Sequence, residues 1–400
     1  MTPGAPPLPS DSAVVLGAGY AGLTVAHEVH RRGKGKIPVI IVDRHTVHEL
    51  RTELYEVGRI AGAGEDATRW TVPLAKVFGK TSVQPREAVV EGIDLEAKVV
   101  RLDTGPLPYR ALAICLGSVP AYYGVPGAAE FSHSVYGWAG AQRLGQHLKE
   151  LARTSQRLEG ERRPRVVVVG GGSTGTELAA EVATTDWAEV VGHAARPMDV
   201  ILLTGSLPFL AGLPPRLIDH ARDLLARARV TVIHGFNVAE VAADRVRLED
   251  GSVLRADAIV WCAGLEAPPL VRTLPVAHGK GGRVAVSETL QIPGRPEAFA
   301  VGDVVEFKDP STGLLVPATA QAALAEARVA GRNLAAHWEG SPLTPFRYRE
   351  RGVVVAVGRG RGAGTLRRVT VWGRPAALLK RIVESDYARS VHGGSSPSDL

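Results

Sequence analysis

The chain has 400 residues, of which 45% are hydrophobic and 22% are charged, and its formal net charge is +6. This composition is typical of a globular protein with two or three domains. Two cysteines exclude a disulfide framework, no apolar run reaches the roughly 20 residues that span a bilayer, and the N-terminal sequence lacks the apolar stretch of a secretory signal. We therefore predict a cytoplasmic protein.

The first predicted element is a buried strand that runs into a glycine-rich turn and a helix, over residues 13–28. Its glycines, Gly17, Gly19 and Gly22, have the G-x-G-x-x-G spacing that places a pyrophosphate at a helix N-terminus. A second apolar strand, residues 39–42, leads into Asp43, and an acid at this position accepts hydrogen bonds from an adenosine ribose. Together these features predict a dinucleotide site.

The chain then continues with shorter strands. Residues 82–93 and 98–102 alternate like strands of a small antiparallel meander, and residues 112–118 read as a short apolar strand that contains Cys115. The proline-containing exit from that strand predicts a crossing to a second domain. His45 and His48 have no partner at metal-ligand spacing, so we read them as loop histidines and predict no metal site.

A second unit, residues 165–183, repeats the strand, the glycine-rich turn and the helix, with Gly170, Gly172 and Gly175 in the same spacing. Its second strand, residues 199–204, ends in Thr204, where an acid would bind the ribose of a dinucleotide. No arginine follows before Arg216, so a site for the 2′-phosphate of NADPH is not evident either. A helix over 214–229 and a strand over 258–264, which holds Cys262 as a core residue, complete the unit.

These motifs carry a family resemblance. The two glycine-rich units, the strands that end in Gly117 and Gly264, and AFAVGD at 298–303 resemble the flavoprotein oxidoreductases with two dinucleotide-binding domains. Within that group, TGTELA at 174–179 and PATAQAA at 317–323 resemble the type II NADH:quinone dehydrogenases.

The resemblance implies an α/β fold with two Rossmann-like dinucleotide-binding domains, one for FAD and one for NAD(P)H, and a small C-terminal α+β segment. The NAD(P)H domain is inserted in the FAD domain. The implied boundaries are 11–122 and 271–344 for the two parts of the FAD domain, 123–270 for the NAD(P)H domain and 345–400 for the basic C-terminal segment.

The same resemblance implies two sets of cofactor contacts. Asp303 is expected at the ribityl and pyrophosphate region of FAD, and its alternative role is to cap the N-terminus of a helix. FAD is expected at Gly17, Gly19, Gly22, Asp43 and Asp303, and NADH at Gly170, Gly172 and Gly175. The other residues expected to contact a cofactor are Ala18, Tyr20, Ala21, Arg44, Val89, Gly117, Ser173, Glu177, Gly264, Ala320 and Gln321.

Two polar residues are implied to be catalytic. Glu177 is expected in the first turn of its helix, where nicotinamide and flavin approach each other, and its alternative is an acid that merely favours a positive helix end. Gln321 is expected in the first turn of a helix over 319–336, near the quinone and the flavin, and its alternative is a surface amide. Ala325 stands where the family carries a second glutamine, which weakens the quinone assignment, while Glu326 matches the acid that follows.

The predicted function is that of an FAD-dependent NADH dehydrogenase that passes hydride to flavin and two electrons to a quinone, without proton pumping. NADPH is the less favoured donor, and no nucleic-acid partner is predicted. Two rivals remain open: a flavoenzyme that reduces a soluble acceptor such as ferredoxin, and a non-catalytic flavin redox sensor.

The C-terminal segment, residues 345–400, has eleven Lys and Arg residues against four Asp and Glu residues, a net charge of +7. Residues 353–357 and 366–372 read as a strand pair and 375–389 as a helix. The helix carries an apolar stripe made of Leu378, Leu379, Ile382, Val383 and Tyr387. This stripe either lies on an anionic membrane surface, at the inner face of the cell membrane, or packs on the flavin domain or on a second subunit in a homodimer.

Overall fold

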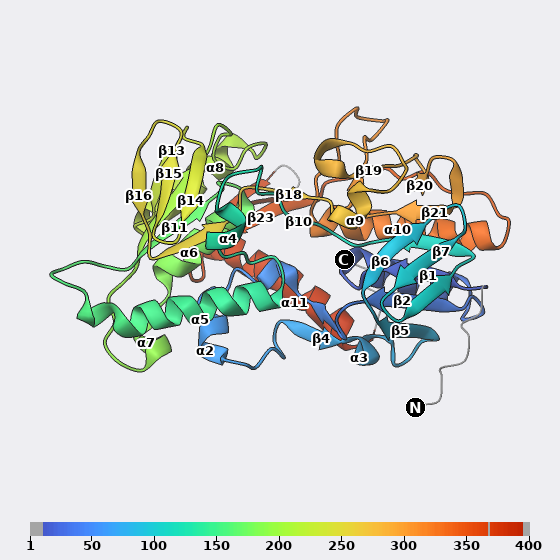
Figure 1. Cartoon of the computed structure of the whole chain (residues 1–400), viewed down its shortest axis with the longest axis horizontal. Helices are drawn as coiled ribbons and strands as arrows, with labels where there is room; N and C mark the ends of the chain where they lie inside the picture. The colour runs from blue at the N-terminus through green and yellow to red at the C-terminus, as the bar shows by residue number, and fades with distance from the viewer. Residues whose placement is uncertain (1–10, 367–368, 395–400) are drawn as a thin grey trace.

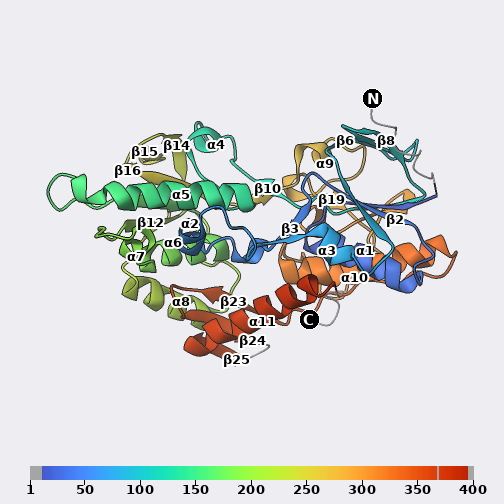
Figure 2. The same cartoon turned by 90° about the horizontal axis from the view of Figure 1, so that it is seen from below.

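The computed structural model describes residues 11–366 and 369–394. Two sheets built mainly of parallel strands lie at opposite ends of an elongated molecule (Figure 1). Figure 2 shows helix α11 (Arg374–His392) running along one edge, between the two ends. The predicted α/β class is therefore confirmed.

The first sheet has six strands in the order β20-β21-β9-β1-β2-β5, and all neighbours are parallel except β20 and β21. Its central strands are short and wholly buried, as expected for a parallel sheet that is covered on both faces. The strands are β1 (Ala13–Leu16), β2 (Val39–Asp43), β5 (Val83–Glu87), β9 (Ala111–Ile114), β20 (Gln291–Ile292) and β21 (Arg295–Ala300).

Two helices, α1 (Tyr20–Arg32) and α10 (Ala320–Trp338), pack side by side on one face of the first sheet. Gly331 allows their close approach, because a Cβ atom there would lie 2.7 Å from the Cβ of Glu28. Figure 2 shows an antiparallel meander on the opposite face. It consists of β6 (Val90–Asp94), β7 (Val99–Leu102) and β8 (Gly105–Pro108).

The second sheet has four parallel strands in the order β13-β12-β11-β17. It shares a core with α5 (Trp138–Thr154), α6 (Ser173–Thr184) and α8 (Pro215–Arg227). The strands are β11 (Arg165–Val169), β12 (Asp199–Thr204), β13 (Thr231–His234) and β17 (Ala258–Trp261). A small antiparallel sheet beside it consists of β14 (Val238–Ala242), β15 (Arg245–Leu248) and β16 (Val253–Arg255).

The two sheets meet where their strands end. Strand β10 (Val119–Pro120) follows β9 of the first sheet, β18 (Leu265–Glu266) follows β17 of the second, and β10 and β18 pair with each other. The carboxyl ends of both parallel sheets therefore adjoin, and this is the edge at which open α/β sheets bind ligands.

Shorter elements connect these parts. Helix α2 (Val57–Ala63) belongs to the N-terminal part of the chain, yet Val57 and Ala61 pack into the core of the second sheet. The remaining elements are β3 (Val47–Glu49), η1 (Arg51–Glu53), β4 (Thr71–Pro73), α3 (Leu74–Phe78), α4 (Ala128–Phe131), η2 (Ser155–Arg157), α7 (Trp187–Val191), α9 (Pro269–Arg272), η3 (Lys280–Gly282), β19 (Val284–Ala285) and β22 (Val305–Glu306).

The meander prediction is confirmed for residues 90–93, which lie in β6, and for 98–102, which contain β7, but it was wrong for residues 83–87. Residues 83–87 form β5, which joins the first sheet beside β2. Strand β5 lies at the edge of the sheet, and Val83 is its only buried residue, so its sequence is polar although its pairing is parallel. Pro85 is compatible with that edge position, because the outer side of an edge strand needs no ladder hydrogen bond.

The C-terminal segment contains one strand more than predicted. Strands β23 (Gly352–Ala356), β24 (Gly362–Leu366) and β25 (Val369–Gly373) form an antiparallel sheet, against which α11 packs. Strand β24 is rich in glycine, so it has little apolar periodicity for a sequence pattern to detect. Residues 367–368 of the strand predicted over 366–372, and residues 395–400 of the basic segment, lie outside the described residues. The domain boundaries given above stay predictions.

Candidate active site

The first glycine loop lies between β1 and α1. Gly17 has φ +96°, and a Cβ atom there would lie 2.4 Å from the carbonyl oxygen of Cys115. A Cβ atom at Gly22 would lie 1.8 Å from the carbonyl oxygen of Gly17, whereas one at Gly19 would meet nothing within 4 Å. Gly17 and Gly22 are thus required by the packing of the loop, and Gly19 borders open space at the helix N-terminus.

The second glycine loop, between β11 and α6, has the same construction. Gly170 has φ +117°, and its Cβ atom would lie 2.3 Å from the carbonyl oxygen of Cys262. The Cβ atom of Gly175 would lie 2.0 Å from the carbonyl oxygen of Gly170, and that of Gly172 would again meet nothing within 4 Å. Each loop therefore leaves open space at the equivalent position, the second glycine of the motif, where a phosphate group fits against helix N–H groups.

Asp43, at the end of β2, lies directly beside the first loop. Its Oδ2 accepts a hydrogen bond from the Ala18 N–H at 2.7 Å, and its Oδ1 accepts one from the His45 N–H at 2.9 Å. A carboxylate has lone pairs left after two such bonds, so Asp43 can also accept from ribose hydroxyls. Arg44, the next residue, is exposed.

Asp303 lies on the other side of the first loop. Its Oδ2 accepts a hydrogen bond from the Ser118 hydroxyl at 2.8 Å, so it is joined to the turn after β9 that contains Gly117. A Cβ atom at Gly302 would lie 3.1 Å from the Cβ of Ala21, which places this strand end against the start of α1. Asp303 lies between β21 and β22 and caps no helix, so its N-cap reading is not supported.

The first loop, with Asp43 and Asp303, fits an adenine dinucleotide. The open space at Gly19 fits a pyrophosphate, and the two carboxylates, one at the end of β2 and one after β21, fit hydroxyl groups on either side of it. Val89, which precedes β6, is 47% exposed, and Tyr20 and Ala21 begin α1.

At the second loop, Thr204 stands where a carboxylate would accept hydrogen bonds from a ribose, and its hydroxyl is already paired with a histidine. Thr204 is buried at the end of β12, and its Oγ1 lies 2.8 Å from Nδ1 of His234. Gly264, after β17, has φ +157°, and Ser173 is the first residue of α6. Arg216 lies in α8, within the helix predicted over 214–229.

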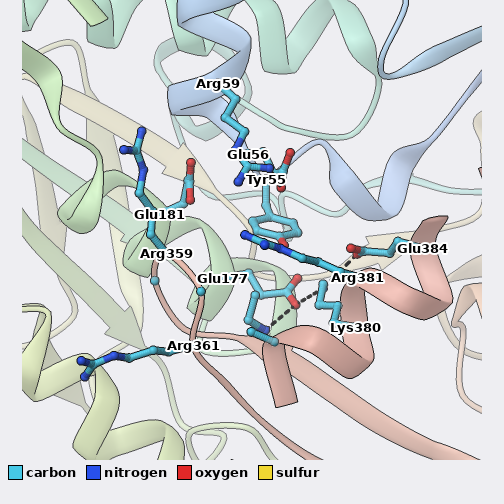
Figure 3. A pocket seen from close by; sticks show the side chains of 14 residues that line it. Tyr55, Glu56, Arg59, Glu177, Glu181, Arg359, Arg361, Lys380, Arg381 and Glu384 are labelled. Carbon is cyan, nitrogen blue, oxygen red and sulfur yellow. Dashed lines mark hydrogen bonds and ion pairs between the residues drawn. The ribbon is translucent and has the colours of Figure 1, made fainter. Parts of the chain in front are cut away.

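Glu177 lies in the second turn of α6, because this helix begins at Ser173; the prediction of the first turn was wrong. Its Oε1 accepts a hydrogen bond from the Ala356 N–H at 3.0 Å and forms an ion pair with the Lys380 ammonium (Figure 3). Glu177 therefore connects α6 to strand β23 and to helix α11.

Lys380 is the central charge of this cluster. Its ammonium lies 3.4 Å from Glu384 and 4.6 Å from the centre of the Tyr55 ring. Burial lowers the pKa of Lys380, but the carboxylates of Glu177 and Glu384 outweigh burial, so the net shift is upward and the ammonium stays charged. The sequence alone predicted no role for Lys380, which lies in α11 next to Leu379 of the apolar stripe.

A pocket opens beside this ion pair, lined by α2, α6, α11 and the turn after β23 (Figure 3). Burial raises the pKa of Glu181 to about 7 and that of Glu384 to about 8. One oxygen of Glu181 is buried without a hydrogen-bond partner in the part of the chain that the structure describes. The pocket wall therefore contains two carboxyl groups that can hold or release a proton near neutral pH.

Gln321 is the second residue of α10, in the first turn as predicted. Its Oε1 accepts hydrogen bonds from the Tyr348 hydroxyl at 3.0 Å and the Arg351 N–H at 3.1 Å, and its Nε2 donates to the Gly352 carbonyl at 3.4 Å. This side chain is thus bound to the segment before β23 rather than free at the surface. Thr319 caps the helix by accepting a hydrogen bond from the Ala322 N–H at 3.2 Å, and Ala320 follows it.

Glu326, one turn further along α10, is fully enclosed. Its Oε2 accepts a hydrogen bond from the Gly302 N–H at 2.7 Å, next to Asp303. Burial raises the pKa of Glu326 to about 8, and the neighbouring Asp303 adds to the rise. Ala325 is half-buried and packs against the core of the first sheet.

The predicted site residues thus form two groups. One surrounds the first glycine loop, with Asp43 and Asp303, and the other surrounds the second loop and reaches the C-terminal helix through Glu177. The sequence reasoning missed Lys380 and Tyr55, and it read His48 as a loop residue although its side chain is fully buried in β3.

Comparison with known proteins agrees with this geometry. Residues 11–327 match the family described as pyridine nucleotide-disulphide oxidoreductase. The chain is 32% identical over 390 residues to the NADH dehydrogenase-like protein Rv1812c of Mycobacterium tuberculosis, an alignment that covers 93% of this chain and 92% of the relative. It is 28% identical over 410 residues to the type II NADH:quinone oxidoreductase Ndh of the same organism, with 96% and 86% covered.

The fold is also found among solved structures. NDH2 from Plasmodium falciparum, solved in complex with NADH, superimposes with a TM-score of 0.80 at 14% identity, over 94% of each chain. The resemblance predicted from the two glycine motifs is confirmed, and the chain belongs to the pyridine nucleotide-disulphide oxidoreductase family.

Proposed function

We propose that this oxidoreductase is an FAD-dependent NADH dehydrogenase that delivers two electrons to a quinone and pumps no protons. The observation that carries the proposal is the pairing of β10 with β18, which brings two glycine loops of the same construction to one place. Relatives with the names NADH dehydrogenase-like protein and type II NADH:quinone oxidoreductase support the choice of donor and acceptor. When bound, FAD supplies a group that accepts hydride and passes electrons on.

The first loop is the proposed FAD site. Gly19 would face the pyrophosphate, Asp43 the adenosine ribose, and Asp303 the ribityl region, where Ser118 holds its carboxylate in place. The N-terminus of α10 would direct N–H groups towards charge that accumulates on reduction. The residues of this loop act by binding and orienting, since the redox chemistry belongs to the cofactor.

The second loop is the proposed NADH site. Gly172 would face the pyrophosphate of NADH, and Gly264 would border the nicotinamide. The hydroxyl of Thr204 is already paired with His234, and the nearest arginine downstream, Arg216, belongs to α8. Nothing in the described chain near Thr204 therefore favours the 2′-phosphate of NADPH, so we propose NADH as the preferred donor.

Glu177 is proposed to act where donor and acceptor meet. Reduction of a quinone by NADH takes up one proton from solution for each hydride delivered, so the site needs groups that protonate near neutral pH. Glu181 and Glu384, whose pKa values burial raises to about 7 and about 8, lie in the pocket beside Glu177 and Lys380. These carboxyl groups would hold the proton that the acceptor takes up.

The C-terminal helix is proposed to attach the protein to an anionic membrane surface. Leu378, Ile382 and Val383 expose 59%, 54% and 53% of their surface, so these three residues of the stripe do not pack on the body of the protein, although Tyr387 at its end does. Arg374 and Arg381 are exposed beside it. An exposed apolar stripe flanked by basic residues fits a peripheral helix that lies in the bilayer surface. None of the described helices is long and apolar enough to cross a bilayer.

The flavin assignment is tested on the purified protein. We expect it to carry one FAD, identified by chromatography after denaturation, and we expect anaerobic NADH to bleach the flavin within seconds. Release of FMN, or the absence of flavin, would refute the cofactor assignment. Bound FAD that NADH fails to reduce would favour the redox sensor instead.

The membrane assignment is tested by flotation with vesicles that contain an anionic phospholipid. We expect binding at low salt that weakens at high salt, because the basic residues act through screened charge. The variant Leu378→Glu/Ile382→Glu should lose binding, while Leu314→Glu, which changes an equally exposed leucine far away in sequence, should keep it. A stripe variant that still floats would exclude this surface, and a variant that converts a dimer into a monomer would assign the stripe to a second subunit.

A further inference from the structure

A chain of buried hydrogen bonds joins the C-terminal helix to the first glycine loop. His48 in β3 has no exposed surface, and Tyr387 of α11 is 5% exposed. Nδ1 of His48 lies 2.9 Å from the Ala18 carbonyl oxygen, and Nε2 lies 3.0 Å from the Tyr387 hydroxyl. Tyr387 and Ala18 are thus connected through a single imidazole ring.

The direction of each hydrogen bond follows from its partners. The Ala18 carbonyl can only accept, so Nδ1 of His48 carries the proton and donates to it. Burial lowers the pKa of His48 to about 4, so the ring is neutral at physiological pH and Nε2 can only accept. The Tyr387 hydroxyl therefore donates to Nε2, and the histidine tautomer is fixed from both sides.

The packing around the imidazole leaves little freedom. The Tyr387 ring stacks on the Tyr20 ring, with centroids 4.5 Å apart, and Tyr20 is the first residue of α1. The His48 and Tyr20 rings form a T-shaped pair with centroids 5.2 Å apart, and the Tyr20 hydroxyl is hydrogen-bonded to Thr52 at 2.9 Å. Tyr387 is thereby held at the point where the loop becomes the helix.

The held carbonyl matters because of its place in the loop. Ala18 lies between Gly17 and Gly19, and its N–H is bound by Asp43 at 2.7 Å while its carbonyl is bound by His48. In a planar trans peptide the C=O and the N–H point in opposite directions, so the Gly19 N–H points away from His48. This N–H has no protein acceptor among the residues that the structure describes.

We propose that Tyr387 and His48 are positioning residues for FAD: they fix the Ala18–Gly19 peptide of the pyrophosphate loop from the C-terminal helix. The inference rests on the proposed function, since it assigns FAD to the first loop. Coupling of this kind is reciprocal, so FAD and the docking of α11 stabilise each other. The helix that carries the exposed apolar stripe thereby supports the flavin site as well.

The test is the rate at which FAD leaves the holoenzyme, followed by the rise of free-flavin fluorescence after dilution. Tyr387→Phe removes one oxygen, keeps the ring stacked on Tyr20 and leaves Nε2 of His48 without a donor. We expect roughly tenfold faster FAD release, on the scale of one buried hydrogen bond. Tyr109→Phe is the matched control, because Tyr109 is buried in the same core and its hydroxyl has no hydrogen bond among the described residues.

A double-variant cycle distinguishes a relay from two separate structural roles. His48→Phe should accelerate FAD release at least as much as Tyr387→Phe, and the double variant should release FAD no faster than His48→Phe, because Tyr387 acts only through His48. Additive effects of the two changes would overturn the relay.

A merely structural role predicts something else: a lower melting temperature with an unchanged rate of FAD release, and this result would also overturn the inference. If His48→Phe does not fold, the comparison of Tyr387→Phe with Tyr109→Phe decides alone. A wild-type protein without FAD would instead refute the proposed function.

Discussion

Replacing Lys380 with methionine tests the charge cluster that joins the second glycine loop to the C-terminal helix. The two side chains of the Lys380–Glu177 pair are 12% and 9% exposed, so their attraction is little weakened by solvent. Methionine keeps most of the volume and removes the charge. Among the described residues, Glu177 then retains only the Ala356 N–H at 3.0 Å, and Glu384 loses the ammonium 3.4 Å away.

The magnitude follows from what is left unpaired. Breaking a buried ion pair from one side costs about 3 to 5 kcal/mol of unfolding free energy. The lower end of that range applies here, because Glu384, with its pKa raised to about 8, can bind a proton, and Glu177 keeps one hydrogen bond. We therefore expect Lys380→Met to destabilise the protein by about 3 kcal/mol at pH 7.

The assay is urea unfolding of the FAD-loaded protein at pH 7. The folded pKa of Lys380 lies above its ordinary value, so its contribution is complete below that value and is lost only as the pH rises through the folded pKa. Lys380→Met/Glu177→Gln should recover most of the loss, since no buried charge remains unpaired. Arg381→Met is the control: its side chain is exposed, so a change within about 0.5 kcal/mol is expected.

The reasoning fails if Lys380→Met is as stable as Arg381→Met. It fails equally if the double variant is destabilised by the sum of the two single changes, because the two side chains would then not interact.

Three further predictions concern the cofactor sites. Gly19→Val should fold with the melting temperature of FAD-free wild-type protein and contain no FAD by absorbance, whereas Gly22→Val should not fold, because its Cβ atom would lie 1.8 Å from a carbonyl oxygen; flavin retained in Gly19→Val would contradict the site. In anaerobic stopped-flow experiments at equal concentrations, NADH should reduce the flavin faster than NADPH, and equal rates would mean that Thr204 does not mark the coenzyme site. Burial raises the folded pKa of Glu326 to about 8, above its ordinary value, so the wild-type protein loses stability as the pH rises from that ordinary pKa through 8. Glu326→Gln has no such proton to lose, so its free energy of unfolding should gain about 4 kcal/mol relative to wild type between pH 5 and pH 9 in urea titrations. A constant difference between the two proteins would show that Glu326 is not buried in its protonated form.

The glycine loops were predictable from the sequence because part of what they require is local. Gly22 and Gly175 are each required by the carbonyl oxygen of a glycine five residues earlier in the same loop, whereas Gly17 and Gly170 are also required by carbonyl oxygens of Cys115 and Cys262, which lie far away in sequence. The N-cap of α10 is also local, because the Thr319 hydroxyl accepts its hydrogen bond from the N–H of Ala322, three residues further on. Strand β24 escaped prediction because its glycines allow close strand packing without apolar side chains, as a Cβ atom at Gly364 would lie 2.8 Å from the Val353 carbonyl oxygen.

The side of α11 that faces the protein was not predictable from its hydrophobic pattern. Periodicity identified a stripe whose members Leu378 and Ile382 are exposed, whereas Tyr387 of the same stripe is buried. The helix docks through Tyr387 together with Lys380 and Glu384, which lie off the stripe. Those contacts depend on partners far away in the chain, such as Glu177, 203 residues before Lys380. A pattern within one helix contains no information about such partners.

The central claim is that electrons pass from NADH through bound flavin to a quinone, and sequential anaerobic mixing tests it most directly. The enzyme is first reduced with one equivalent of NADH and then mixed with a soluble quinone analogue or, in parallel, with oxidised ferredoxin, while flavin absorbance is followed. We predict bleaching in the first step and rapid recovery with the quinone, with little recovery with ferredoxin. Recovery with ferredoxin alone, or flavin that stays oxidised in the first step, would contradict the account.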